Sequence, residues 1–250
     1  MTHYVDHGGT GPAVVLLHSF LMDGDMFAPQ VAALGDTFRL IAIDERGHGK
    51  TPEDGPFTYW DVADDVLAVA DELGLDQFAV VGTSQGGFIG LRLALLAPDR
   101  VTALAVLGTS AAPEDPQVAE AYRGLGALWA TQGPTDQLVD MVATICIGAM
   151  DSSAWKIKLR ALPSDRVTVL MNALVDRDGL LDRLGEISCP TLVLHGSADA
   201  AYPVERAEEI VAAVPKAEPL VLVGGGAHFL SLTDPDAVNP PLRAFLTANT

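Results

Sequence analysis

The fold of this chain is decided by the stretch Gly82-Thr83-Ser84-Gln85-Gly86-Gly87. Residues 78–81 before it are apolar and predict a short buried strand, and residues 88–96 after it predict a helix. A serine in a sharp strand-to-helix turn, between glycines that let the two elements approach closely, is typical of a nucleophile elbow. The elbow predicts a projecting Ser84 hydroxyl and a Gln85 N–H at the positive end of the helix, where it suits a developing oxyanion.

Short apolar runs recur along the chain and predict parallel strands that are buried on both faces. Besides the run before the elbow, they cover residues 13–17, 39–43, 101–107, 191–195 and 219–223. Helical patterns between them run from Asp61 to Leu73 and from Pro203 to Val214. This alternation predicts an α/β fold with a mostly parallel central sheet and helices on both faces.

The alternation stops between residues 112 and 187, where the sequence is mostly helical and is interrupted by prolines. We therefore expect a core of residues 1–111 and 188–250 and a helical cap of residues 112–187. A cap inserted between two core strands is expected over the carboxyl edge of the sheet, where ligands bind in such folds. Candidate apolar residues for a substrate pocket there are Met22, Trp129, Met141, Trp155, Leu162 and Phe229.

A serine becomes a good nucleophile near neutral pH only when a base lies within hydrogen-bond reach. Among the six histidines, His228 is the best candidate for that base. It follows the predicted strand at residues 219–223 and three glycines at residues 224–226, which predicts a loop at the carboxyl end of a strand. We therefore predict that His228 accepts the proton of Ser84.

The histidine needs an acid that fixes its tautomer, and Asp199 is the best candidate. It lies just beyond the carboxyl end of the predicted strand at residues 191–195. Along the chain the serine comes first, then the acid and then the histidine. This is the order expected when the serine lies in a strand-to-helix elbow. Asp176 and Asp178 are weaker candidates because they lie in the predicted cap and follow no core strand.

A second oxyanion donor is expected from His18-Ser19-Phe20-Leu21-Met22, which follows the first core strand. This loop is expected to face the elbow across the carboxyl edge of the sheet, so that the Phe20 and Gln85 N–H groups form the oxyanion hole. His18 itself is interpreted as a structural residue that shapes the loop.

Composition argues against several classes of partner. The formal net charge of −18 disfavours nucleic acid and anionic membranes as partners. No apolar run is long enough to span a bilayer, and the segment Met1 to His7 shows no signal-peptide pattern. Cys146 and Cys189 are predicted to be buried thiols, which favours a reducing compartment and a cytoplasmic location. The sequence leaves open whether the protein forms homo-oligomers.

No cofactor or metal is predicted from the motifs. The chain has no H-E-x-x-H spacing for zinc, and no G-x-G-x-x-G opens the first strand-to-helix turn. The expected reaction partner is a small-molecule substrate alone.

The chain resembles the α/β-hydrolase superfamily over nearly its whole length. The segments that carry the resemblance are His18 to Met22, Asp44 to Gly49, the elbow, and His195 to Asp199 together with His228. Within the superfamily the chain looks most like small cofactor-free esterases and perhydrolases, also called non-haem haloperoxidases.

This resemblance has two departures and one further implication. The family commonly has His-Gly-Phe where this chain has Ser19 in the middle position, and the short N-terminus implies reduced leading strands. The resemblance also implies that the segment Asp44 to Gly49 is a structural turn, so no catalytic role is expected for His48.

We therefore predict a serine hydrolase that cleaves a small neutral carboxylic ester or lactone through an acyl-enzyme. Hydrolysis of a carbon–carbon bond by the same triad and perhydrolysis, with peroxide in place of water, are alternatives. An alternative of another class is a ligand-binding sensor that keeps the triad but turns over slowly. Epoxide hydrolases and haloalkane dehalogenases are disfavoured, because the resemblance implies Asp in them where this chain has Ser84.

Overall fold

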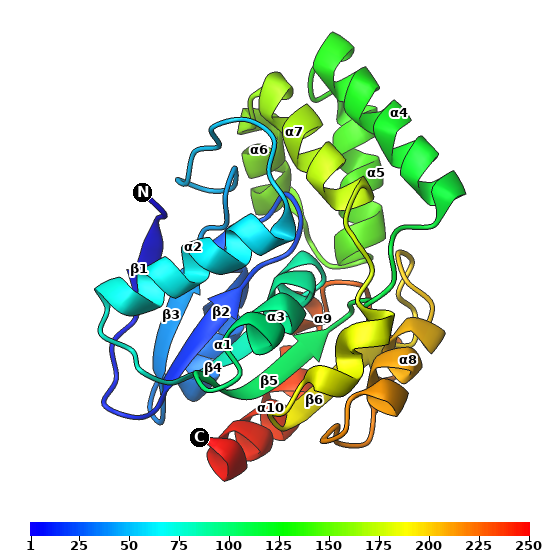
Figure 1. Ribbon diagram of the computed structural model, residues 1–250. Helices are drawn as coiled ribbons and strands as arrows, with labels where there is room; N and C mark the ends of the chain where they lie inside the picture. Colours follow the sequence, from blue (N-terminus) through cyan, green and yellow to red (C-terminus); the bar gives the residue numbers. More distant parts are fainter.

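Seven strands form one sheet in the order β1-β3-β2-β4-β5-β6-β7 in the computed structural model, which describes residues 1–250 (Figure 1). The strands are β1 Tyr4–Asp6, β2 Ala13–Leu17, β3 Arg39–Ile43, β4 Phe78–Thr83, β5 Val101–Leu107, β6 Thr191–Gly196 and β7 Val221–Val223. Only β1 pairs antiparallel, with β3, and all other neighbours are parallel. The predicted mostly parallel sheet is confirmed.

Ten α-helices lie along the chain between and after the strands. They are α1 Ala28–Leu34, α2 Tyr59–Glu72, α3 Gln85–Leu96, α4 Pro116–Gln132, α5 Asp136–Ile147, α6 Ser153–Ala161, α7 Ser164–Val175, α8 Glu205–Ala213, α9 Leu230–Thr233 and α10 Pro235–Asn249. Two 3₁₀ helices add short turns at Gly24–Phe27 and Leu181–Glu186.

Alternate residues of each core strand face opposite sides of the sheet. On β2, Val15 and Leu17 belong to the larger apolar cluster, which residues of α2, α3 and α8 complete. Val14 and Leu16 belong to the second cluster, which residues of α1 and α10 complete. Because both faces are covered, the strands require continuous apolar runs, and this requirement is the reason the sequence reveals them.

Capping residues explain where α2 begins and ends. The predicted start was Asp61, but the helix begins at Tyr59 because Thr58 and Asp61 form a capping box. The Thr58 side chain accepts a hydrogen bond from the Asp61 N–H, and the Asp61 carboxylate accepts one from the Thr58 N–H. Gly74 follows the helix with a φ of 65°, a left-handed conformation that favours glycine.

The helices α4 to α7 gather at one end of the molecule, apart from the helices that flank the sheet (Figure 1). All four fall within residues 112–187, the segment in which the sequence predicts helices. The helices α4 and α7 pack closely. A Cβ added to Gly126 of α4 would lie only 3.4 Å from the Met171 side chain of α7. The division of the chain into a core and a separate cap stays a prediction.

None of the helices combines the length and the apolar character needed to cross a membrane. Both cysteines are free thiols. Cys189 is buried as predicted, whereas Cys146 is only half-buried as a residue, so the prediction that both are buried is wrong for Cys146. Burial raises the pKa of the Cys146 thiol to about 12, so this thiol stays protonated near neutral pH.

Truncating a core side chain of the central sheet is expected to destabilise the protein strongly. Leu104 on β5 has no exposed surface, so Leu104→Ala should lower the free energy of unfolding by about 2–5 kcal/mol. Leu222→Ala is the matched control, because Leu222 on the edge strand β7 is 51% exposed. Urea unfolding curves of both variants measure the difference. Equal midpoints for the two variants would contradict this packing.

Candidate active site

Ser84 occupies a strained turn between β4 and α3. Its φ of 51° and ψ of −108° are rare for a residue with a side chain, and such strain costs on the order of 1–3 kcal/mol. The glycines at either side have no room for a side chain. A Cβ on Gly82 would lie 2.2 Å from the Gly86 carbonyl oxygen, and one on Gly86 would lie 2.0 Å from the Leu17 carbonyl oxygen. Glycine is therefore required at both positions.

A hydrogen-bonded chain joins Ser84, His228 and Asp199. Ser84 Oγ lies 2.8 Å from His228 Nε2, and His228 Nδ1 lies 2.8 Å from Asp199 Oδ2. A carboxylate only accepts hydrogen bonds, so Nδ1–H donates to Asp199 and Nε2 is left to accept from the Ser84 hydroxyl. The three residues follow β4, β6 and β7, and the structure brings all three together as the sequence predicts.

Asp199 is buried and fully engaged, with a side chain that is 1% exposed. Its Oδ1 accepts hydrogen bonds from the backbone N–H groups of Ala201, at 2.7 Å, and Tyr202, at 2.9 Å. Burial raises the pKa of the Asp199 carboxyl, but the hydrogen bond and attraction of His228 and the two amides outweigh burial and hold that pKa below its usual value. Asp199 is therefore ionised near neutral pH and stabilises a proton on His228.

The backbone N–H groups of Phe20 and Gln85 donate to no other group of the protein. The loop that carries Phe20 is fastened to the elbow, because the Gly86 N–H donates to the His18 carbonyl oxygen at 2.9 Å. The hydroxyl of Ser19 also donates to the Thr83 carbonyl oxygen at 3.0 Å. Ser19, which stands where the resembled family commonly has glycine, thus adds a second hydrogen bond between this loop and the elbow.

A cavity of about 60 Å³ borders Ser84 and His228. Apolar side chains from the core and from α4, α5 and α7 line it, and no Lys, Arg, Asp or Glu does. Its other lining residues are Phe20, Leu21, Tyr122, Leu125, Val142, Ile145, Cys146, Met171, Leu174, Ala201, Tyr202 and Phe229.

Of the six residues proposed for the pocket, only Phe229 lines this cavity. Trp129 is fully buried in a cluster with side chains of α5, α6 and α7, Trp155 is buried in another cluster, and Met141 is 41% exposed. Met22 and Leu162 line a separate, polar cavity of about 410 Å³. The expectation was wrong for these five, because apolar character in the sequence predicts burial but not which neighbour a side chain contacts.

The cavity contains residues that the sequence analysis missed. Tyr202 packs edge-on against the His228 ring, with 5.5 Å between ring centroids. It lies only three residues after Asp199, so its place beyond the same strand could have identified it. Cys146 and Val142 lie on α5, and no sequence signal separates their face of the helix from the others.

The two weaker acid candidates are engaged elsewhere. Asp176 pairs with Arg123, and Asp178 pairs with Arg92 and accepts a hydrogen bond from the Trp60 indole N–H at 3.0 Å. Neither contacts His228 in the hydrogen-bonded chain described above.

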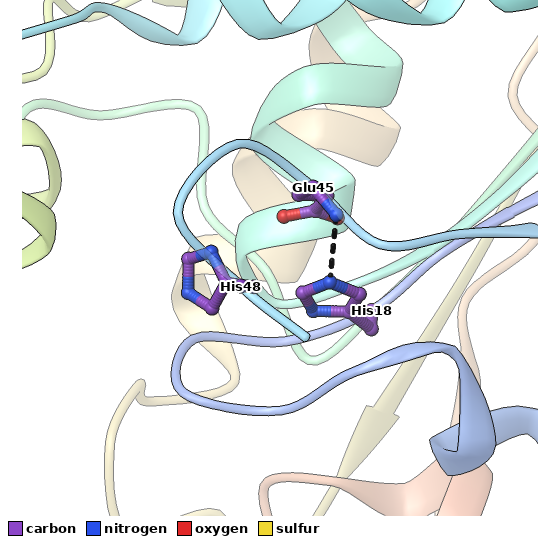
Figure 2. Close-up of side chains that lie close together, drawn as sticks. All are labelled: His18, Glu45 and His48. Atoms are coloured by element: carbon purple, nitrogen blue, oxygen red, sulfur yellow. Dashed lines mark hydrogen bonds between the residues drawn. The ribbon is translucent and has the colours of Figure 1, made fainter. Parts of the chain in front are cut away.

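Ligand atoms of His18, Glu45 and His48 lie within 4.8 Å of one another, and Figure 2 shows the three side chains converging. Both ring nitrogens of His18 are already used. Its Nδ1 donates to the Ser19 carbonyl oxygen at 2.8 Å, and its Nε2 accepts from the Glu45 N–H at 3.0 Å. Two free ligand residues are fewer than the three or four that hold zinc in proteins, so this cluster does not fit a metal centre.

Comparison with known proteins agrees with this fold. A sequence profile described as the alpha/beta hydrolase fold matches residues 12–136. A protein named as a carbamate hydrolase, RutD, of Caulobacter vibrioides is 31% identical and aligns over 98% of this chain and 94% of its own length. The class of protein is therefore a hydrolase of the α/β type.

Two solved structures extend the comparison. An esterase from Thermogutta terrifontis superposes with a TM-score of 0.86 and 28% identity, covering 99% of this chain and 93% of that chain. The enol-lactonase from Burkholderia xenovorans LB400 superposes with a TM-score of 0.87 and 29% identity, covering 98% and 96%. The chain belongs to the α/β-hydrolase family, as its resemblance implies.

A side chain at Gly86 is expected to disable the elbow. The added Cβ of Gly86→Ala meets the Leu17 carbonyl oxygen, so the backbone must move, and a shift of about 1 Å at such a site costs on the order of 10²-fold in rate. Gly185→Ala is the control, since a Cβ there meets no atom within 4 Å. Hydrolysis of p-nitrophenyl acetate measures both variants. Wild-type rates in Gly86→Ala would show that the turn tolerates a side chain.

Proposed function

We propose that the protein is a serine hydrolase that cleaves small neutral carboxylic esters or lactones. The observation that carries this proposal is the hydrogen-bonded chain from Asp199 through His228 to Ser84, which opens on an apolar cavity. The two unpaired N–H groups of Phe20 and Gln85 support it, because an acyl-transfer enzyme needs free donors for the oxyanion.

In the proposed mechanism, the Ser84 oxygen attacks the carbonyl carbon while His228 Nε2 accepts the hydroxyl proton. The Phe20 and Gln85 N–H groups hold the negative oxygen of the tetrahedral intermediate, and one such donor is worth about 3–4 kcal/mol in the transition state. His228 then gives its proton to the leaving alcohol, and Asp199 stabilises the transient imidazolium. Water, deprotonated by His228, repeats the attack on the acyl-enzyme and releases the acid.

The size and chemistry of the cavity favour a short, uncharged substrate group. Its volume of about 60 Å³ accommodates only a few water molecules or a short alkyl chain. A charged group would be buried there without a partner, which is costly. The names of the related esterase and enol-lactonase support esters and lactones, rather than carbon–carbon bonds, as the first substrates to test.

Turnover is expected to depend on the Ser84 hydroxyl. Ser84→Ala should abolish hydrolysis of p-nitrophenyl acetate and butyrate, because the nucleophile is lost while the fold is kept. Product is followed over many enzyme equivalents, and unfolding curves confirm that the variant is folded. Sustained turnover by Ser84→Ala would refute the proposed nucleophile. A wild-type burst that stops near one equivalent would instead support the slow-turnover sensor.

Enlarging the cavity is expected to shift preference toward longer acyl chains. Leu125 on α4 lines the cavity, so Leu125→Ala should raise the ratio of p-nitrophenyl hexanoate to acetate hydrolysis roughly tenfold. Leu128→Ala is the matched control, because Leu128 lies on the same helix and is 45% exposed. The ratio of kcat/KM values is measured for both variants. An unchanged ratio in Leu125→Ala would place the acyl group elsewhere.

A further inference from the structure

Glu45 connects the two segments that carry the proposed oxyanion donors. Its carboxylate accepts a hydrogen bond from the side-chain amide of Gln85, the residue directly after Ser84. Its backbone N–H donates to His18 Nε2 at 3.0 Å, the bond drawn in Figure 2, and His18 lies at the start of the loop that carries Phe20. One buried residue thus contacts both halves of the proposed oxyanion hole.

The side chain of Gln85 is held at both ends of its amide. Its nitrogen donates to Glu45 Oε2, and its oxygen accepts from the Tyr59 hydroxyl at 2.9 Å. Glu45 is 1% exposed, and Gln85 and Tyr59 are each 2% exposed, so no solvent competes for these bonds. The two contacts fix which way the side-chain amide points, and they anchor Gln85, the first residue of α3.

Two buried atoms in this network have no hydrogen-bond partner in the protein, Glu45 Oε1 and His48 Nε2. The Nδ1 of His48 donates to the Arg46 carbonyl oxygen at 3.0 Å, so its Nε2 carries a free lone pair. Both unpartnered atoms are acceptors when Glu45 is ionised, and a buried acceptor without a donor costs free energy. A proton on Glu45 Oε1 removes one unpaired acceptor and supplies a donor to this region.

We propose that Glu45 is a positioning residue for the oxyanion hole and that it works as an uncharged carboxylic acid. This inference rests on the proposed serine-hydrolase function. The neutral acid holds Gln85, and through it the direction of the Gln85 N–H. Once the proton is lost, a buried negative charge lies close to the developing oxyanion and destabilises the transition state.

The surroundings of Glu45 favour the uncharged form at pH values below about 7. Burial raises the pKa of Glu45 to about 7, against the opposing effects of His18 and the Gln85 hydrogen bond, and the negative Asp44 adds to the rise. Burial lowers the pKa of His48 to about 3, so this ring stays neutral and provides no cation for Glu45. The remaining titratable or charged groups that act on this network are Tyr59 on α2, Arg92 on α3, Glu114, Arg166 on α7 and Arg177.

The sign of the pH effect follows from the raised pKa. The carboxyl is protonated below pH 7 and ionises as the pH rises through about 7, so the positioned form is lost on the alkaline side. The histidine base of a serine hydrolase has the opposite effect, because it must be deprotonated to act. An alkaline decline in kcat is therefore expected from ionisation of Glu45 and not from deprotonation of the histidine base.

The experiment compares pH profiles of wild type, Glu45→Gln and Glu72→Gln for p-nitrophenyl acetate between about pH 6 and 9. In wild type, kcat is expected to fall on the order of tenfold between pH 7 and 8.5, with KM unchanged, because oxyanion contacts act only in the transition state. Glu45→Gln keeps an acceptor for Gln85 but cannot ionise, so its kcat should stay level over that range. Glu72→Gln is the control, because Glu72 is exposed at the end of α2 and should keep the wild-type profile.

A second variant separates positioning from charge. Tyr59→Phe removes the other hydrogen bond to Gln85, so kcat should fall severalfold while the alkaline decline is kept. If Glu45→Gln does not fold, infrared spectroscopy of the wild type replaces it. A carboxylic-acid carbonyl band that is present at pH 6 and disappears by pH 8.5 supports the proposal, and its absence at pH 6 overturns it.

The outcomes distinguish this inference from the function on which it rests. Labelling of Ser84 by a fluorophosphonate reports the proposed nucleophile independently of Glu45. Labelling together with an alkaline decline that persists unchanged in Glu45→Gln overturns the inference and leaves the function standing. Absence of labelling in the folded wild type counts against the proposed function itself.

Discussion

The strained backbone at Ser84 is the constraint from which the rest of the site follows. Its left-handed φ is kept by close packing of Gly86 on the Leu17 carbonyl and by the Thr109 hydroxyl, which donates to the Ser84 carbonyl oxygen at 2.7 Å. Because the turn reverses just before α3, the Gln85 N–H belongs to no helical hydrogen bond. The Ser84 hydroxyl and the free Gln85 amide are therefore held in one rigid turn, and the strain is tolerated because the surrounding sheet over-determines that turn.

The carboxyl edge of the sheet concentrates polar side chains that are buried. His18 follows β2, Glu45 and His48 follow β3, Gln85 follows β4 and Asp199 follows β6. Each forms hydrogen bonds with backbone groups or with another buried side chain, and among them Glu45 Oε1 and His48 Nε2 are left without a partner. Such a network fixes side chains more sharply than apolar packing does, because a displaced polar group is left unpaired in a medium of low dielectric constant. The same edge therefore carries the Ser84, His228 and Asp199 side chains and holds them in fixed orientations.

The sequence predicted most strands, the elbow and the three residues that meet at it, because buried parallel strands need continuous apolar runs and their ends share one edge. It did not predict which residues of α4 to α7 line the cavity, as Trp129 and Met141 illustrate. An apolar residue on a helix predicts that its side chain is buried, but not which neighbouring segment buries it. Glu45 was interpreted as part of a structural turn, because burial of a carboxylate depends on distant segments that bring Tyr59 and Gln85 over it.

Contacts at the base of the helical segment of residues 112–187 link the wall of the cavity to His228. Glu114 and Arg177 lie near its two ends and form a buried ion pair at 2.8 Å, with side chains 4% and 2% exposed. The Tyr202 hydroxyl donates to the same Glu114 carboxylate at 3.0 Å, while the Tyr202 ring packs against His228. A buried ion pair adds little net stability, but removing one partner is costly, so it specifies a single arrangement. The wall of the cavity and the orientation of the histidine are consequently set by one set of contacts.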